Sequence, residues 1–272
     1  MSGGSIGGAG SPGAGAAGTA LATTLGQARY VNRAFWRNPA RAFFTFAFPL
    51  MFLIIFTSLL GNGTVAIGAI PVKQSTYYVA SMASFGVITA CFNNIAINMT
   101  FNRESGILKR IDGTPLPHAV FFASRIVHAT GVGVLLVAIT VAFGRLAYDA
   151  HLPGGGTLAR FLVMLLVGAA AFCALGLAVT VVIPNADAAA AIVNITILPL
   201  LFLSGIFIPF GDGTPAWILW IARIFPVRHF AVGMQAAFLG TPFRWSDVLV
   251  VAGWGLAGVL LAVRFFSWEP RR

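Results

Sequence analysis

The residues with the most chemical potential form one short charged block between two apolar regions, Asn102-Arg-Glu-Ser-Gly-Ile-Leu-Lys-Arg-Ile-Asp112-Gly-Thr-Pro-Leu-Pro117. Five of the chain's 24 charged side chains lie in it: Arg103, Glu104, Lys109, Arg110 and Asp112. Mixed charges on a short segment beside apolar stretches suit the binding of a soluble partner. The block is therefore a candidate docking segment for another protein rather than a catalytic centre.

Motifs that would indicate catalysis are missing from the sequence. It has no GxxxxGK[ST] phosphate-binding loop, and its lysines, Lys73 and Lys109, lack that glycine context. It also has no HExxH motif. Cys91 and Cys173 lie in apolar stretches without paired spacing, which is typical of small buried hydrophobic residues rather than metal ligands. We expect no catalytic residues, no metal ligands and no cofactor bound by this chain.

The block itself has the signals of a short helix. Asn102 could cap its start, with Glu104 in the first turn, and Gly113 suits its end because Pro115 and Pro117 prevent continuation. One face would be apolar and another basic, so the helix could rest on a membrane or enter a groove. A solvated loop without a partner is the alternative.

Composition indicates which solvent surrounds these residues. The 272 residues are 58% hydrophobic and 9% charged, and the mean hydropathy is +0.89. A soluble domain would have about 25% charged residues. We therefore predict an all-α, polytopic membrane protein. The net charge of +10 could suggest nucleic acid, but the basic residues lie in short loops between apolar spans, which favours membrane anchoring and no nucleic-acid partner.

Apolar runs of about 20 residues predict six transmembrane helices. We place them near 42–60, 77–100, 119–143, 161–183, 189–208 and 247–266. Residues 1–18, rich in Gly and Ala, are expected to form a flexible tail, 19–38 an interfacial helix and 39–272 the membrane domain. The Pro- and Trp-containing stretch 209–246 is expected to form short, re-entrant helices before the last span.

The predicted interfacial helix has an apolar stripe and a basic ridge. Arg29, Arg33 and Arg37 recur every four residues, as guanidinium groups among anionic lipid headgroups would. A basic flank before the first span is the simpler alternative. Asn38-Pro39 suits a helix cap followed by a first helical residue. Eleven Lys and Arg residues flank the spans on the side of the termini and the charged block, against six on the other, so that side is predicted to be cytoplasmic.

Amides inside the predicted spans are candidate substrate-path residues. Asn94 and Asn98 lie one turn apart on one face of the second span, and Asn194 lies in the fifth. Unpaired amides are costly in lipid, so these side chains should face other helices or a cavity. Hydrogen bonding between helices and lining of a transport route are both consistent with the pattern.

Three motifs resemble one family of membrane proteins. Arg103-Glu104-x-Gly106-x-Leu108-x-Arg110 with Thr114-Pro115-Leu116-Pro117 is similar to the cytoplasmic loop of type-2 ATP-binding-cassette (ABC) export permeases. Leu203–Pro209 resembles the end of the fifth span of that family, and Pro226–Gly233 the segment before the sixth. The chain departs from the family pattern near Gly233 and Gln235, where an acidic and a basic residue are common.

The resemblance implies a function in export. It implies that Arg103, Glu104, Gly106, Leu108, Lys109 and Arg110 belong to a coupling helix that docks on a separate ABC ATPase, which binds the ATP and Mg²⁺. It also implies a second permease subunit, contact with membrane lipids, the bacterial plasma (inner) membrane and a drug, lipid or glycolipid as cargo, as in antibiotic-resistance exporters. A stand-alone secondary carrier or structural membrane protein is the alternative.

Overall fold

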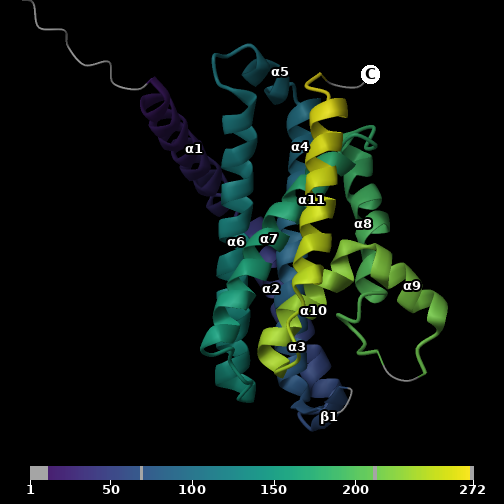
Figure 1. Ribbon diagram of the computed structural model, residues 1–272. Helices are drawn as coiled ribbons and strands as arrows, with labels where there is room; N and C mark the ends of the chain where they lie inside the picture. Colours follow the sequence, from purple (N-terminus) through teal and green to yellow (C-terminus); the bar gives the residue numbers. More distant parts are fainter. Residues whose placement is uncertain (1–11, 68–69, 211–212, 270–272) are drawn as a thin grey trace, which may run out of the picture.

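The computed structural model describes residues 12–67, 70–210 and 213–269. Figure 1 shows a bundle of helices with one small hairpin of strands. In chain order the elements are α1 (Pro12–Trp36), α2 (Pro39–Leu60), β1 (Thr64–Ile67), β2 (Ile70–Lys73), α3 (Gln74–Ile88), the π-helical turn η1 (Thr89–Asn93), α4 (Asn94–Glu104), α5 (Ile107–Asp112), α6 (His118–Tyr148), α7 (Gly156–Val179), α8 (Ala186–Phe202), α9 (Ala216–Ile224), α10 (Pro226–Leu239) and α11 (Trp245–Phe265).

The predicted all-α, polytopic membrane fold is confirmed. Within the described residues, five helical rods are long and apolar enough to cross a bilayer: α2, the continuous rod α3–η1–α4, α6, α7 and α11. The predicted fifth span corresponds to α8, which has 17 residues. At 1.5 Å per residue it is about 26 Å long, slightly less than a typical hydrocarbon core. Each predicted span therefore coincides with an apolar helix.

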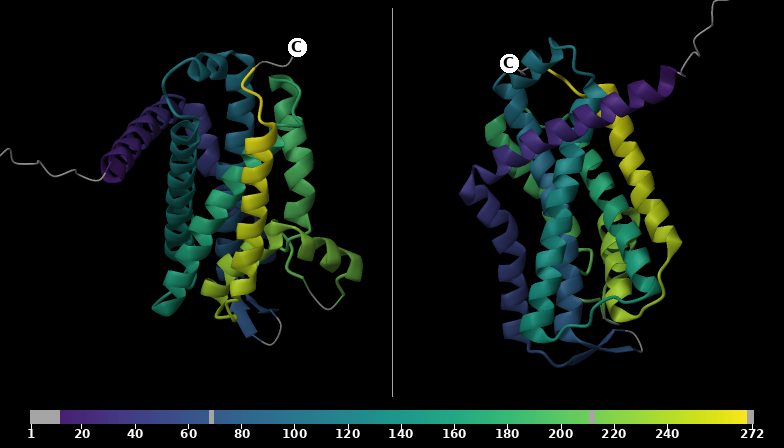
Figure 2. Two further views of the ribbon diagram at one scale, coloured as in Figure 1. Left: turned by 45° about the horizontal axis from the view of Figure 1, so that its top comes forward. Right: turned by 90° about the vertical axis from the view of Figure 1, so that its left-hand side faces the viewer.

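The two ends of the bundle carry different elements (Figures 1 and 2). One end carries α5 and the C-terminal segment, and we call it the α5 end. The other end carries β1, β2 and the loop between α6 and α7, and we call it the hairpin end. The strands pair antiparallel, with Thr64 opposite Lys73. No strand was predicted here, because a four-residue strand is too short to show a clear alternating pattern.

Helix α3 is the central element of the bundle. Every residue from Ser75 to Ile88 is buried, and α3 packs against α2, α6 and α10. Helices α7 and α11 form the most extensive helix pair. At Gly255 of α11 an added Cβ would lie 2.8 Å from the Cβ of Ala171, so glycine is what allows this close approach.

Helix α1 lies across the outside of the bundle near the α5 end, oblique to the spans (Figure 2). Its residues Ala28, Val31 and Phe35 are buried, and the helix packs on α6. The helix begins at Pro12, inside the stretch predicted as a flexible tail, and residues 1–11 of that stretch lie outside the described part of the chain. A turn at its end leads into α2, where the Asn38 side chain accepts a hydrogen bond from the Arg41 backbone N–H at 3.1 Å.

Helix α8 ends at Phe202, before the predicted end of the fifth span at 208, and irregular chain follows it; the stretch 209–246 predicted to be re-entrant contains the two short helices α9 and α10. After α8 the chain turns at Gly205, which has a φ of 82°, and Ile206 and Phe207 are buried without helical structure. The hydroxyl groups of Tyr77 and Tyr78 donate to the carbonyl oxygens of Gly205 and Phe207. Such partners are needed because buried irregular backbone must satisfy its polar groups within the protein. Helix α10 is then buried against α3 and α7, whereas Trp217 and Trp220 of α9 are exposed.

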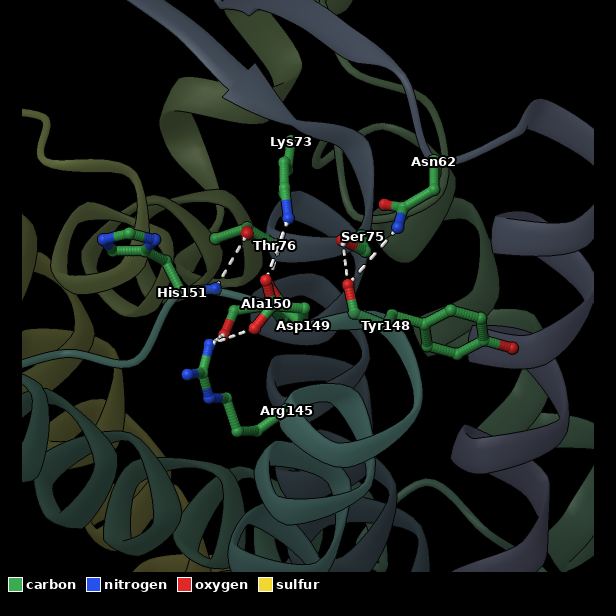
Figure 3. Close-up of polar contacts among 9 residues, drawn as sticks. All are labelled: Asn62, Lys73, Ser75, Thr76, Arg145, Tyr148, Asp149, Ala150 and His151. Carbon is green, nitrogen blue, oxygen red and sulfur yellow. Dashed lines mark hydrogen bonds and ion pairs between the residues drawn. The ribbon is translucent and has the colours of Figure 1, made fainter.

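A polar cluster ties the strand hairpin to the end of α6 (Figure 3). Asp149, in a left-handed conformation with φ 52°, accepts from Lys73 at 3.2 Å and from Arg145 at 2.5 Å. The backbone N–H of His151 donates to the Thr76 hydroxyl at 3.1 Å. The hydrogen bond from Lys73 and the charge of Arg145 lower the pKa of the exposed Asp149 carboxyl. These contacts close the hairpin end of the bundle.

Candidate functional site

The charged block lies at the α5 end, but it folds differently from the prediction. Helix α4 continues through Asn102 to Glu104, the chain turns at Gly106 with a φ of 71°, and α5 begins at Ile107. Asn102 therefore does not cap the block's helix and Glu104 is not in its first turn; both expectations are wrong. The reason is that the second span extends further than its apolar residues indicate. The expected end at Gly113 is confirmed.

Arg103 is a buried anchor rather than an exposed docking residue. Its side chain is almost fully buried, with 2% of the residue's surface exposed. One guanidinium nitrogen donates to the carbonyl oxygen of Thr180 at 3.0 Å and another to that of Ile183 at 2.6 Å. These carbonyls lie just after α7, where the last turn of a helix leaves acceptors without partners. Arg103 thus fixes the end of α4 to the turn between α7 and α8.

Glu104 connects the end of α4 to the start of α8. Its carboxylate accepts a hydrogen bond from the backbone N–H of Ala186, the first residue of α8. A negative charge at this position complements the positive end of the α8 dipole. Asn185 caps the same helix by accepting from the N–H of Ala188 at 2.9 Å. The last turn of α4 therefore contacts the end of α7 and the start of α8.

Helix α5 is held at one face and presents charged side chains at the other. Leu108 is fully buried, whereas Lys109 and Arg110 are exposed. Lys109 pairs with Glu269 at 3.3 Å, in the segment that follows α11. The helix is thus attached to the bundle through its apolar side and through the C-terminal segment, and the Arg110 side of α5 remains accessible.

The start of α6 provides a second link between α5 and the segment that follows α11. The carboxylate of Asp112 accepts from the ring nitrogen Nε2 of His118 at 2.8 Å. The His118 ring stacks on Trp268 with 4.2 Å between ring centres. A displacement of α5 would therefore be transmitted to α6 and to the segment after α11.

Asn94 and Asn98 lie together and line two hollows, which agrees with the expectation that these amides face other helices or a cavity; their place in a substrate path stays a prediction. The Nδ2 of Asn98 donates to the carbonyl oxygen of Asn94 at 2.5 Å, and Arg41 of α2 donates to the Asn94 side chain. The pair therefore contributes to hydrogen bonding between helices and also lines cavities. Asn194 lies apart from them, exposed on α8.

The first hollow is a polar cavity of about 200 Å³ between α1, α4 and α6. Its polar lining consists of Arg41, Asn94, Asn98, Asn102, Arg125 and His128. The second hollow is a groove of about 650 Å³ between α2 and the rod formed by η1 and α4. Its lining combines apolar side chains such as Phe44, Phe48 and Phe101 with polar ones, mostly amides and threonines. Arg41, Asn94 and Asn98 line both hollows, so the cavity and the groove are adjacent.

Sequence reasoning missed the cationic character of this cavity. Arg41 and Arg125 belong to the basic residues that flank the spans, and only the fold brings them together with His128. The sequence signal that could have indicated this cavity is the presence of Arg125 and His128 within the apolar residues of the predicted third span, 119–143. Arg29 and Arg33 are exposed on α1 and Arg37 is exposed directly after it, and none of the three lines this cavity.

Comparison with known proteins identifies the family. The sequence pattern of the ABC-2 type transporter family matches residues 28–239, which include the last part of α1 and all of α2 to α10. The chain belongs to this family. As a family member it is a multi-pass membrane subunit of a transporter, which agrees with its apolar helices and its motifs.

Named relatives support this assignment for the ABC-2 chain. The putative transport permease YvfS of Bacillus subtilis is 24% identical over 83% of this chain and 89% of its own length. The putative transport permease ycf38 of Porphyra purpurea is 25% identical over 81% of this chain and 75% of its own length. The daunorubicin resistance ABC transporter permease protein DrrB1 of Streptomyces coeruleorubidus is 25% identical over 86% of this chain and 81% of its own length.

Proposed function

We propose that this chain is the permease subunit of an ATP-driven exporter that moves a hydrophobic or amphipathic substrate, such as a drug, a lipid or a glycolipid, out of the cytoplasm. A separate ABC ATPase binds ATP and Mg²⁺ and docks on α5. A second permease subunit, identical or homologous, completes the membrane part. The α5 end faces the cytoplasm of a bacterial cell, the protein lies in the plasma membrane, and both termini are cytoplasmic.

The attachment of α5 is the observation that carries this proposal. A docking helix must be exposed to its partner and yet fixed to the helices that move. Arg110 is exposed on α5, whereas Leu108 is fully buried against the bundle. Immediately before α5, Arg103 and Glu104 connect α4 to the turn between α7 and α8. A push on α5 therefore reaches several spans at once.

The proposed cargo class is supported by the groove and by one relative. The groove between α2 and α4 offers about 650 Å³ with aromatic and amide side chains, which suits an amphipathic molecule. The name of DrrB1 refers to daunorubicin resistance, which fits the proposal that a drug is among the possible cargoes.

Capture of the ATPase tests the proposal. The full chain, carrying an affinity tag, is purified in detergent from the membranes of its native host, and the captured proteins are searched for an ATPase with a GxxxxGK[ST] motif. We expect R110E to reduce the captured ATPase about tenfold, since reversal of an interface charge opposes association. The matched control is R244E, because Arg244 is exposed near the start of α11 at the hairpin end.

Two outcomes contradict the proposal. If the wild-type chain captures no ATPase, or if its transport continues when the ATPase is deleted, a stand-alone carrier is the better description. If R110E and R244E capture the ATPase equally well, α5 is not the docking element.

A further inference from the structure

We propose that the cavity between α1, α4 and α6 binds the phosphate-bearing, anionic headgroup of a membrane lipid, and that the adjoining groove between α2 and α4 holds the lipid's acyl chain. The cavity is separate from α5, and lipid binding at it requires no ATPase; the groove is the one that supports the proposed cargo class, so the inference rests on the proposed function in that respect.

The first argument is uncompensated charge. Arg41 and Arg125 are half-buried and line the same cavity as His128. Among residues 12–67, 70–210 and 213–269, neither guanidinium group forms an ion pair with a carboxylate. Buried cations in membrane proteins normally pair with an acid, because an isolated charge is costly away from water. The missing negative charge is what an anionic ligand would supply.

The second argument is the hydrogen-bonding state of the two arginines. The Nε of Arg125 is buried without a partner, and its guanidinium lies 5.0 Å from the centre of the Phe121 ring. Arg41 donates to the Asn94 side chain and lies 5.6 Å from the centre of the Phe35 ring. A guanidinium group has five N–H donors, so donors remain for a ligand. The planar guanidinium matches the geometry of a phosphate.

The third argument is size and depth. The cavity has about 200 Å³, several times the ~30 Å³ that a water molecule occupies in the liquid, so it has room for a phosphate-sized group. Arg41 is in the first turn of α2, Asn102 is in the last turn of α4, and Arg125 is near the start of α6. Each of the three lies within about two turns of a helix end, where basic and polar side chains are expected to meet lipid headgroups.

The fourth argument is the groove beside the cationic cavity, because its lining includes a set of apolar side chains from two helices. Phe44, Phe48 and Pro49 of α2 face Ile97 and Phe101 of α4 across it. Arg41, Asn94 and Asn98 belong to both linings, so a bound molecule could extend from one hollow to the other. A cationic pocket next to a groove with apolar side chains is complementary to a molecule with an anionic head and an apolar tail. A free phosphate would leave the groove unused.

The test is a binding measurement on the purified full-length chain in neutral detergent without the ATPase. The probes are phosphatidylglycerol, phosphatidylcholine with the same acyl chains, and glycerol 3-phosphate. Bound lipid is counted by native mass spectrometry, and binding is also followed as an increase in the unfolding temperature. We expect phosphatidylglycerol to bind at least tenfold more tightly than either other probe.

Charge-neutral variants locate the site. R41Q and R125Q should each weaken phosphatidylglycerol binding about tenfold, because each removes a charge-assisted contact. R160Q is the matched control, since Arg160 is exposed in the first turns of α7, away from this cavity, and it should bind as the wild type does. R125K keeps the charge but loses the planar guanidinium, so its binding should be intermediate. The unfolding temperature of each variant without lipid shows that it is folded.

Three results would overturn the proposal. Equal binding of phosphatidylglycerol and phosphatidylcholine would show that the negative charge of the headgroup does not contribute to the affinity. Wild-type affinity in both R41Q and R125Q would place the lipid elsewhere. Glycerol 3-phosphate binding as tight as that of the lipid would identify a site for a water-soluble anion and would remove the groove from the argument.

Discussion

The carboxylate of Glu104 accepts a hydrogen bond from the backbone N–H of Ala186, 82 positions later in the chain. Through this bond the last residue of α4 supplies a hydrogen-bond acceptor to the backbone N–H of the first residue of α8. The contact lies directly before Gly106, where the chain turns into α5. Helix α5 at the end of the bundle is thereby connected to the antiparallel helices α7 and α8.

Substitution of Glu104 should loosen the start of α8. In E104A the N–H of Ala186 loses its acceptor, and we expect about tenfold faster amide hydrogen exchange in residues 184–190, as loss of a helix-terminal partner costs on the order of 1 kcal/mol. D187N is the control, because Asp187 carries the same charge in the first turn of α8 and is exposed. Equal exchange in E104A and wild type would show that this contact does not hold α8.

Arg103 should contribute more to stability than the exposed basic residues of the block. R103M removes the donors to the carbonyl oxygens of Thr180 and Ile183 and leaves both acceptors buried. We expect a loss of about 3 kcal/mol, seen as a lower unfolding temperature in detergent. R110M, a change of the same kind at an exposed position, should have little effect. Similar unfolding temperatures for the two variants would contradict the anchoring role.

The packing of α7 against α11 should depend on Gly255. A Cβ at this position would meet the Cβ of Ala171 at 2.8 Å and its Cα at 2.9 Å, so G255A forces the two helices apart and should destabilise the protein by about 1–3 kcal/mol. Gly253 is in the same helix with nothing within 4 Å of an added Cβ. G253A should leave the unfolding temperature unchanged or raise it slightly. An equal decrease of the unfolding temperature in G255A and G253A would show that the contact between Gly255 and Ala171 is not the cause of the destabilisation.

The cluster at the hairpin end should respond to the charge of Asp149. Asn tolerates a left-handed conformation nearly as well as Asp, so D149N removes the charge without straining the backbone. We expect faster hydrogen exchange in the segment 62–76, because Lys73 and Arg145 lose their anionic partner.

Acidification of the wild type should reproduce that effect. The hydrogen bond from Lys73 and the charge of Arg145 lower the pKa of Asp149 below its ordinary value of 3.8. A lowered pKa means that the pairing is fully present above 3.8 and is lost as the pH falls through the lowered value. The difference between wild type and D149N should therefore be present at pH 7 and vanish in strong acid. A difference that persists unchanged in acid would show that the carboxylate charge is not its cause.

The chemistry of short stretches was enough to predict the membrane fold. Apolar runs fix where a helix must cross lipid, because the backbone there can be satisfied only within the helix. Local capping chemistry placed the break at Asn38-Pro39, and glycine and proline placed the end of α5 near Gly113. These signals act over a few residues and can be read from the chain alone.

The tertiary structure decided which distant residues meet. The sequence placed Arg103, Glu104 and Arg110 in one charged block, but in the structure the buried Arg103 and the exposed Glu104 bond to the segment between α7 and α8, whereas Arg110 is exposed on α5. It likewise joined Arg41 and Arg125, which are 84 positions apart, around one cavity. Hydrophobic periodicity specifies which side of a helix is buried but not its neighbour, so partners across the bundle follow only from how the helices pack.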